Sequence, residues 1–130
     1  MVTTTALYAA ILALISIVLA NRAGMTRVRL QIPLGDGGNK DLIAAIRPHA
    51  NFVEFVPLIL VMMAMIELNG APKWSLHALG APLVIARVIH PLGISTEQMS
   101  SPLRMIGSLV TAIVTVACAL LLLWQAVGAL

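Results

Sequence analysis

Three side chains in the stretch RPHANFVEF, residues 47–55, could together bind a charged ligand. Arg47, Asn51 and Glu54 are separated by steps of four and three residues, and because each residue turns a helix by about 100°, they share one stripe. The apolar run that follows would place this stripe in or beside a lipid bilayer, where a charged side chain costs roughly 2.5 to 3.5 kcal/mol. Such a cost indicates a role for the stripe, either as a binding site or as an ion pair that holds helices together.

Further polar side chains lie at the ends of other apolar runs. Arg87 and His90 are three residues apart and would share a helix face, Arg104 begins the last run, and Arg22 follows the first. Arginines at helix ends commonly extend to the lipid headgroups, which would account for Arg22 and Arg104. A lone histidine such as His90 could hydrogen-bond between helices. A binding site is favoured over these structural roles if separate helices bring the side chains to one place.

The elements that would position these residues are four apolar segments. The chain of 130 residues is 60% hydrophobic and 10% charged, which is typical of an integral membrane protein, and each segment has about the 20 residues that a spanning helix requires. No alternating pattern suggests a membrane barrel. Basic residues follow the first run rather than precede it, so we expect a retained helix and not a cleaved signal. The sequence predicts one all-α membrane domain, a bundle of four transmembrane helices over residues 4–22, 42–69, 74–93 and 103–128.

The distribution of basic residues predicts the orientation of these helices. The first link carries Arg22, Arg27, Arg29 and Lys40, and the third link ends at Arg104. The positive-inside rule puts both links in the cytoplasm and both termini on the outer side of the membrane. Polar residues of the last three helices would then meet at one depth, in the cytoplasmic half of the bilayer.

The composition disfavours several other functions. Basic residues are few and no aromatic residues alternate with them, so nucleic acid is not an expected partner. The single cysteine, Cys118, lies in the last apolar run, where a small hydrophobe is the simplest interpretation. One cysteine forms no intrachain disulfide, and no Cys/His spacing suggests a metal site.

The polar side chains define what a ligand should carry. Carboxylates would suit the guanidinium groups, an ammonium group would suit Glu54, and amides would suit Asn51. Glutathione, a small peptide with two carboxylates, one ammonium group and a thiol, meets this description. An arginine beside the thiol would favour the thiolate, which is the nucleophile. Composition alone does not select glutathione over another small anion.

The stretch RPHANFVEFVPLIL resembles the second-helix signature of the membrane-associated proteins in eicosanoid and glutathione metabolism, the MAPEG family. That signature is an Arg, an Asn four residues later, a Glu three residues further and a Pro after three more, which Arg47, Asn51, Glu54 and Pro57 match. The stretches ARVIHPLGI and PLRMIG are similar to the end of the family's third helix and the start of its fourth.

This resemblance implies a homotrimer of four-helix protomers in a bacterial inner membrane, acting as a glutathione-dependent transferase or peroxidase. Glutathione, the co-substrate, would bind between protomers, and a lipophilic electrophile or hydroperoxide would enter from the bilayer. Arg104 would be the catalytic residue that stabilises the thiolate. The glutathione-binding residues would be Arg47, Asn51, Glu54, Arg87, Arg22 and His90.

The sequence also departs from the family pattern. Phe55 stands where a tyrosine is common, and His90 and Ile94 stand where members often have tyrosines near the end of the third helix. These departures disfavour leukotriene or prostaglandin chemistry. Two other functions stay open: a small proton-coupled exporter, although that class typically carries its glutamate in the first helix, and a membrane subunit without catalytic activity whose ion pairs only set packing.

Overall fold

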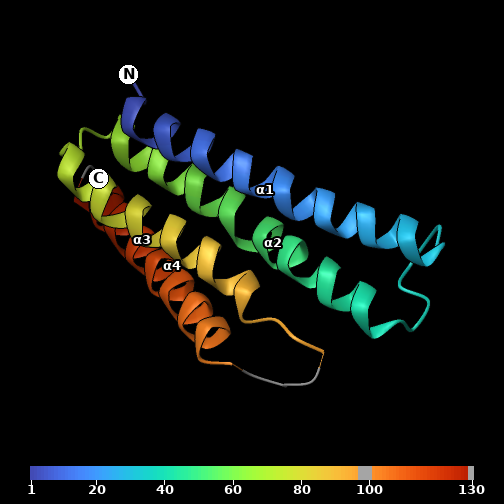
Figure 1. Cartoon of the computed structure of the whole chain (residues 1–130). Helices are drawn as coiled ribbons and strands as arrows, with labels where there is room; N and C mark the ends of the chain where they lie inside the picture. Colours follow the sequence, from blue (N-terminus) through green and yellow to red (C-terminus); the bar gives the residue numbers. More distant parts are fainter. Residues whose placement is uncertain (97–100, 129–130) are drawn as a thin grey trace.

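The chain folds into four long helices, as a computed structural model shows for residues 1–96 and 101–128 (Figure 1). All four are long and apolar enough to cross a membrane, which confirms the predicted all-α fold class with four candidate spans. Their bounds are α1 Thr3–Leu30, α2 Lys40–Leu68, α3 Lys73–Leu92 and α4 Pro102–Gly128.

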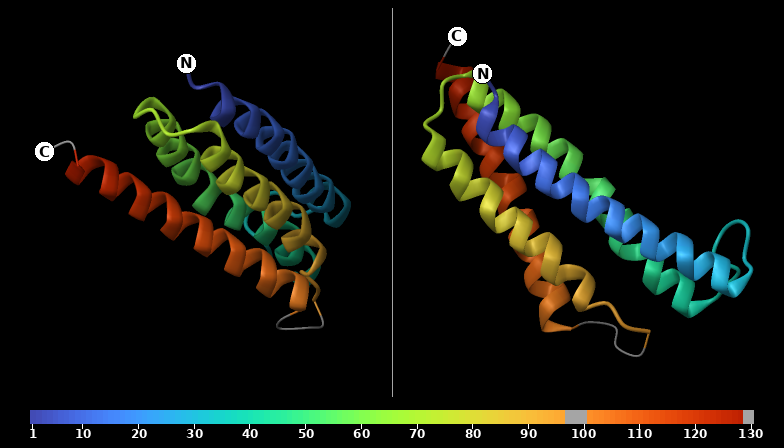
Figure 2. Two further views of the ribbon diagram at one scale, coloured as in Figure 1. Left: turned by 90° about the vertical axis from the view of Figure 1, so that its left-hand side faces the viewer. Right: turned by 45° about the horizontal axis from the view of Figure 1, so that its top comes forward.

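The helices run side by side with alternating direction, so the two termini lie at one end of the bundle (Figures 1 and 2). The closest packing is between neighbours in sequence, α1 with α2 and α3 with α4, and α2 and α3 each contact both α1 and α4. At the end opposite the termini, the α1–α2 hairpin extends beyond the ends of α3 and α4 (Figure 2). The end of α3 and the start of α4 therefore lie short of the α1–α2 link along the bundle (Figure 2).

Helix α1 is longer than its apolar segment. The apolar run predicts that this helix ends at residue 22, whereas in the structure it continues to Leu30. The next residue, Gln31, is its C-cap, with a left-handed φ of 55°. The end of an apolar run is not a helix stop signal, and no proline occurs before Pro33. Arg27, expected in a link, is helical, and its Nη1 donates to the carbonyl oxygens of the following turn at 3.1 and 2.7 Å.

Side chains from three helices hold the bundle together at the end that carries the termini. Glu67 accepts hydrogen bonds from the backbone N–H groups of Thr4 and Thr5, both at 2.8 Å, and thereby caps α1. The Tyr8 hydroxyl hydrogen-bonds His77 Nδ1 at 2.8 Å, linking α1 to α3. Because Thr4 and Thr5 are 63 and 62 residues from Glu67 in sequence, no local pattern indicates this cap.

The apolar core lies between the four helices, and a large apolar surface remains outside it. Leu12, Ile59, Leu83 and Cys118 are among the buried side chains, and the burial of Cys118 fits its interpretation as a small hydrophobe. The share of buried residues is 44% in the apolar window of α3 and 22–28% in the other helices. Helix α3 is thus the most enclosed by protein. Because less of its surface would face lipid, its sequence can be the least apolar of the four.

Candidate functional site

Arg87 is the most deeply buried charged side chain of the candidate site. It projects from α3 with 2% of its surface exposed. Its Nη1 donates to Asn51 Oδ1 on α2 at 2.8 Å, and its Nη2 donates to the Gly107 carbonyl oxygen at 3.2 Å and to the Thr111 hydroxyl, both on α4. A guanidinium has five donors in a rigid fork, so one side chain reaches three helices at once.

This burial changes the role that Arg87 can have. The resemblance suggested that Arg87 binds a carboxylate of the ligand, but within the protomer its Nη groups already bond to protein and almost none of its surface is accessible. Asn51 instead receives a fixed orientation from it, because the amide oxygen accepts from Arg87.

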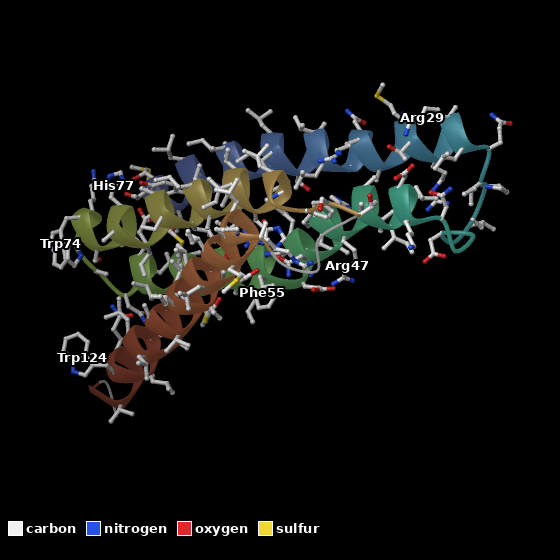
Figure 3. The ribbon with its side chains drawn as sticks, turned by 60° about the horizontal axis from the view of Figure 1, so that its bottom comes forward. Arg29, Arg47, Phe55, Trp74, His77 and Trp124 are labelled. Atoms are coloured by element: carbon white, nitrogen blue, oxygen red, sulfur yellow. The ribbon has the colours of Figure 1, made fainter. Side chains whose placement is uncertain are left out.

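Arg47 and Glu54 form the outer part of the predicted stripe on α2. Their closest atoms, Arg47 Nη1 and Glu54 Oε1, are 4.0 Å apart, and the two side chains are 54% and 50% exposed. A half-exposed ion pair at this limiting distance contributes little to stability, about 0–1 kcal/mol. Both groups therefore keep most of their hydrogen-bonding capacity for a ligand. Along the bundle, Arg47 lies between the levels of His77 and Arg29 (Figure 3).

His90 lies where α3 packs tightly against α4. Only 4% of it is exposed, and a Cβ added to Gly107 would be 2.7 Å from the His90 Cβ atom. On the same helix face, one turn before His90, Arg87 bonds to Asn51 of α2. Residues of α2, α3 and α4 thus lie close together here, and His90 is enclosed between α3 and α4.

Arg104 is exposed in the first turn of α4 and is positioned by the end of α3. The Ser101 hydroxyl donates to the Gly93 carbonyl oxygen at 2.7 Å and accepts from the Arg104 backbone N–H at 3.3 Å. A Cβ at Gly93 would overlap the Arg104 backbone nitrogen. A glycine is therefore needed at position 93 because the α4 backbone approaches closely. Backbone conformation is not the reason, since a φ of −92° is open to any residue.

Arg22 is not brought to the other predicted residues within the protomer. It is exposed on α1 and borders a hollow of about 600 Å³ whose lining comes from α1 alone. The other lining residues of this hollow are Val18, Asn21, Met25, Thr26 and Arg29.

Two residues that sequence reasoning did not assign to the site support it from α4. The Gly107 carbonyl oxygen accepts a hydrogen bond from Arg87, and the absence of a side chain at Gly107 lets His90 approach. The Thr111 hydroxyl also accepts from Arg87 and donates to the Gly107 carbonyl oxygen at 2.8 Å. Their spacing of four residues was visible, but a small residue one turn before a threonine occurs in many helices. The spacing becomes informative only once Arg87 is seen to bond to both residues.

The exposed charged side chains of the candidate site are Arg47, Glu54 and Arg104. Across residues 1–96 and 101–128, no group of three His, Cys, Asp or Glu side chains could hold a metal. A ligand in front of α2 would meet the half-exposed Arg47 and Glu54 and, at the start of α4, Arg104.

Comparison with known proteins identifies relatives of the chain. The model of the MAPEG family matches residues 5–124. The inner membrane protein YecN of Escherichia coli strain K12 is 37% identical over 89 residues, which cover 68% of this chain and 68% of YecN. The inner membrane protein YecN of Escherichia coli O6:H1, strain CFT073, is similar to the same extent.

Proposed function

Because the chain belongs to the MAPEG family, we propose that it is a membrane enzyme that uses glutathione as a co-substrate. It would act on lipophilic electrophiles as a transferase or on lipophilic hydroperoxides as a peroxidase. The name of the Escherichia coli relatives and the four candidate spans support an inner-membrane location.

The observation that carries this proposal is the convergence of arginines from three helices around one polar level. Arg87 of α3 bonds to Asn51 of α2, one turn after Arg47, and to Gly107 of α4, one turn after Arg104. Grouping like charges in an apolar bundle is unfavourable unless anionic groups offset them, and Glu54 is the only carboxylate among the predicted site residues. A peptide with two carboxylates would place two anionic groups at this level.

Each exposed side chain has a distinct role in binding glutathione. The Glu54 carboxylate would accept from the ligand ammonium group, and the Arg47 guanidinium would donate to a carboxylate. The Asn51 amide nitrogen would donate to a peptide carbonyl, since its oxygen is held by Arg87. Arg87 is in this scheme a positioning residue, because it acts on the ligand through Asn51.

Arg104 would stabilise the negative charge of the glutathione sulfur. In a transferase reaction the thiolate attacks an electrophilic carbon, the C–S bond forms, and the leaving group departs with the bonding electrons. In a peroxidase reaction the thiolate attacks the terminal oxygen of a hydroperoxide and becomes a sulfenic acid, while the departing alkoxide takes a proton. A second glutathione then reduces the sulfenic acid to a disulfide and water.

The enzyme would be a homotrimer in which glutathione binds between neighbouring protomers. Arg47 and Glu54 are half-exposed on the outside of the protomer, so a neighbouring chain could cover the ligand from the other side. Arg22, which lies apart from the stripe in its own protomer, would then reach the ligand from the neighbour. The exposed apolar faces of the helices provide surface for such packing.

Calorimetry of the purified protein with glutathione tests this function. Arg47→Ala and Glu54→Gln should each weaken binding by about tenfold or more, since each removes a charge-assisted hydrogen bond worth about 1.5–3 kcal/mol. Arg29→Ala is the matched control, because Arg29 is exposed on the α1 extension outside the stripe. Equal binding heats in all four proteins would remove the proposed pocket.

Arg87 is tested by separating affinity from stability. Arg87→Met should weaken glutathione binding and Arg87→Lys should restore part of it, because a lysine retains one donor for Asn51. A purely structural Arg87 would lower thermal stability in both variants with no change in affinity among the folded molecules.

The two other functions give different results in the same set of proteins. A proton-coupled exporter would release protons on addition of lipophilic cations, and Glu54→Gln would lack this release. A subunit without catalytic activity would lose stability on Arg104→Ala while its conjugation and peroxidase activities stay at background in every variant.

A further inference from the structure

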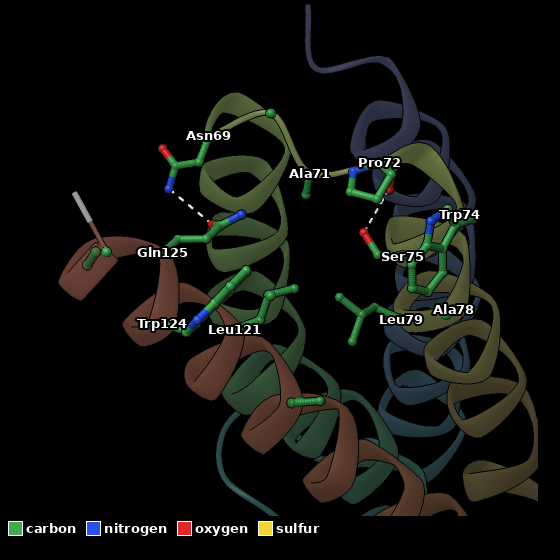
Figure 4. A pocket seen from close by; sticks show the side chains of 14 residues that line it. Asn69, Ala71, Pro72, Trp74, Ser75, Ala78, Leu79, Leu121, Trp124 and Gln125 are labelled. Atoms are coloured by element: carbon green, nitrogen blue, oxygen red, sulfur yellow. Dashed lines mark hydrogen bonds between the residues drawn. The ribbon is translucent and has the colours of Figure 1, made fainter.

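A second hollow lies at the opposite end of the bundle from Arg104, next to the two termini (Figure 4). It is formed where the start of α3 and the end of α4 separate, and its volume is about 1260 Å³. Pockets for small ligands have volumes of roughly 300–1,000 Å³, so this space is large enough for an extended apolar chain. None of the proposed glutathione residues lines it.

The lining of this hollow divides into an apolar wall and a polar mouth. The wall consists mainly of small or aliphatic residues, among them Ala78, Leu79, Ala117 and Leu121. At the mouth, Asn69 Nδ2 donates to Gln125 Oε1 at 3.1 Å, and these side chains lie above the wall (Figure 4). The hollow therefore suits an amphiphile whose polar part stays at the mouth.

Two tryptophans border the same hollow, one from each helix. Trp74 of α3 and Trp124 of α4 are 71% and 73% exposed and are the only tryptophans of the chain. Tryptophan concentrates at the membrane interface, where its ring contacts apolar groups and its indole N–H reaches the polar lipid region. In a bilayer, this preference would place the mouth of the hollow near the lipid ester groups and its wall among the acyl chains.

The lining also limits the chemistry of the occupant. Among the residues that the structure describes, no charged side chain lines the hollow, so its lining offers no charge that would select a headgroup. An apolar space that opens to hydrocarbon fills with the molecules around it, and in a membrane these are lipid chains.

We propose that this hollow binds one acyl chain of a phospholipid, with the ester region of that lipid at the Asn69–Gln125 pair. The chain lies along Leu79, Ala117 and Leu121, and the two tryptophans flank the glycerol region. The lipid fills the separation between α3 and α4 on the side of the termini. This site is independent of the proposed glutathione site, which lies near the other end of α3 and α4.

Tryptophan fluorescence measures this binding directly, because both tryptophans of the chain border the hollow. The protein in detergent is titrated with phosphatidylethanolamine that carries brominated acyl chains, since bromine quenches an indole that it contacts. We expect quenching that saturates at one lipid per chain, with the same midpoint for brominated phosphatidylglycerol. Ala78→Phe and Ala117→Phe fill the hollow and should raise the midpoint about tenfold, as expected when burial of roughly two methylene groups is lost.

The matched control is Ala10→Phe, an exposed alanine on α1 in the same half of the bundle that does not line the hollow. Its titration should follow that of the unmodified protein. Quenching that rises in proportion to the lipid-to-detergent ratio without saturation, or that is equal in all variants, would overturn the proposal. Weak quenching that increases only when the oligomer dissociates would assign the hollow to a second copy of the chain. Glutathione calorimetry on the same samples should be unchanged by Ala78→Phe, so failure here is distinct from failure of the proposed enzyme function.

Discussion

The two glutamates of α2 should respond in opposite ways to the same substitution. Glu67 accepts two backbone hydrogen bonds at 2.8 Å, from Thr4 and Thr5 at the start of α1. Glu54 forms a long ion pair with Arg47, at 4.0 Å, and half of its side chain is exposed. Replacing each by glutamine keeps the size and removes the charge. We expect Glu67→Gln to lower stability and Glu54→Gln to lower ligand binding.

The expected loss at Glu67 follows from the groups it satisfies. A hydrogen bond to a charged group contributes about 1.5–3 kcal/mol, and a carboxylate at a helix N-terminus adds about 0.3–1 kcal/mol. Glutamine keeps one carbonyl oxygen, so one of the two bonds survives without its charge. Val2, the residue before α1, provides no side-chain cap that could replace it. We expect Glu67→Gln to lower the free energy of unfolding by about 2 kcal/mol.

The corresponding change at Glu54 should be small. Exposed ion pairs contribute about 0–1 kcal/mol, so the unfolding free energy of Glu54→Gln should stay within about 1 kcal/mol of the unmodified protein. Its affinity for glutathione should fall by about tenfold or more, because the amide does not offer a full negative charge to the ligand ammonium group.

Both quantities can be measured on the same preparations. Unfolding in mixed micelles, followed by helical circular dichroism during titration with a denaturing detergent, gives the stability, and calorimetry below the transition gives the glutathione affinity. The reasoning is refuted if Glu67→Gln is as stable as the unmodified protein. It is also refuted if the two variants lose stability and affinity in the same proportion, since the two carboxylates would then have no separate roles.

Three further substitutions test the packing that surrounds the site. Gly107→Ala should cost about 1–3 kcal/mol despite the better helix propensity of alanine, because its Cβ would be 2.7 Å from the His90 Cβ atom; equal unfolding curves would contradict this. Gly80→Ala should be at least as costly, since its Cβ would be 2.5 Å from the Tyr8 Cε2 atom. Tyr8→Phe removes the 2.8 Å hydrogen bond to His77 and should lower thermal stability by about 1 kcal/mol without affecting glutathione binding.

The sequence alone determined the class of the protein and one face of its site. Four apolar segments of spanning length predict four helices. In lipid every backbone polar group must be hydrogen-bonded within the protein, and a helix satisfies these groups within a single segment. The steps from Arg47 to Asn51 to Glu54 predict one stripe because helical geometry is local. The family signature rests on the same residues, and the match over residues 5–124 confirms it.

The tertiary structure decided which polar residues are buried between helices and which are exposed. Arg87 looked like a ligand-binding residue, yet it bonds to residues 36, 20 and 24 positions away in sequence and positions Asn51. Glu67 caps α1 by accepting a hydrogen bond from Thr4, 63 residues earlier in the sequence. The tryptophans of α3 and α4 were unremarkable in sequence but border one hollow. Such roles depend on how each helix is rotated about its axis and which helix lies beside it, and those quantities are set by packing between distant segments.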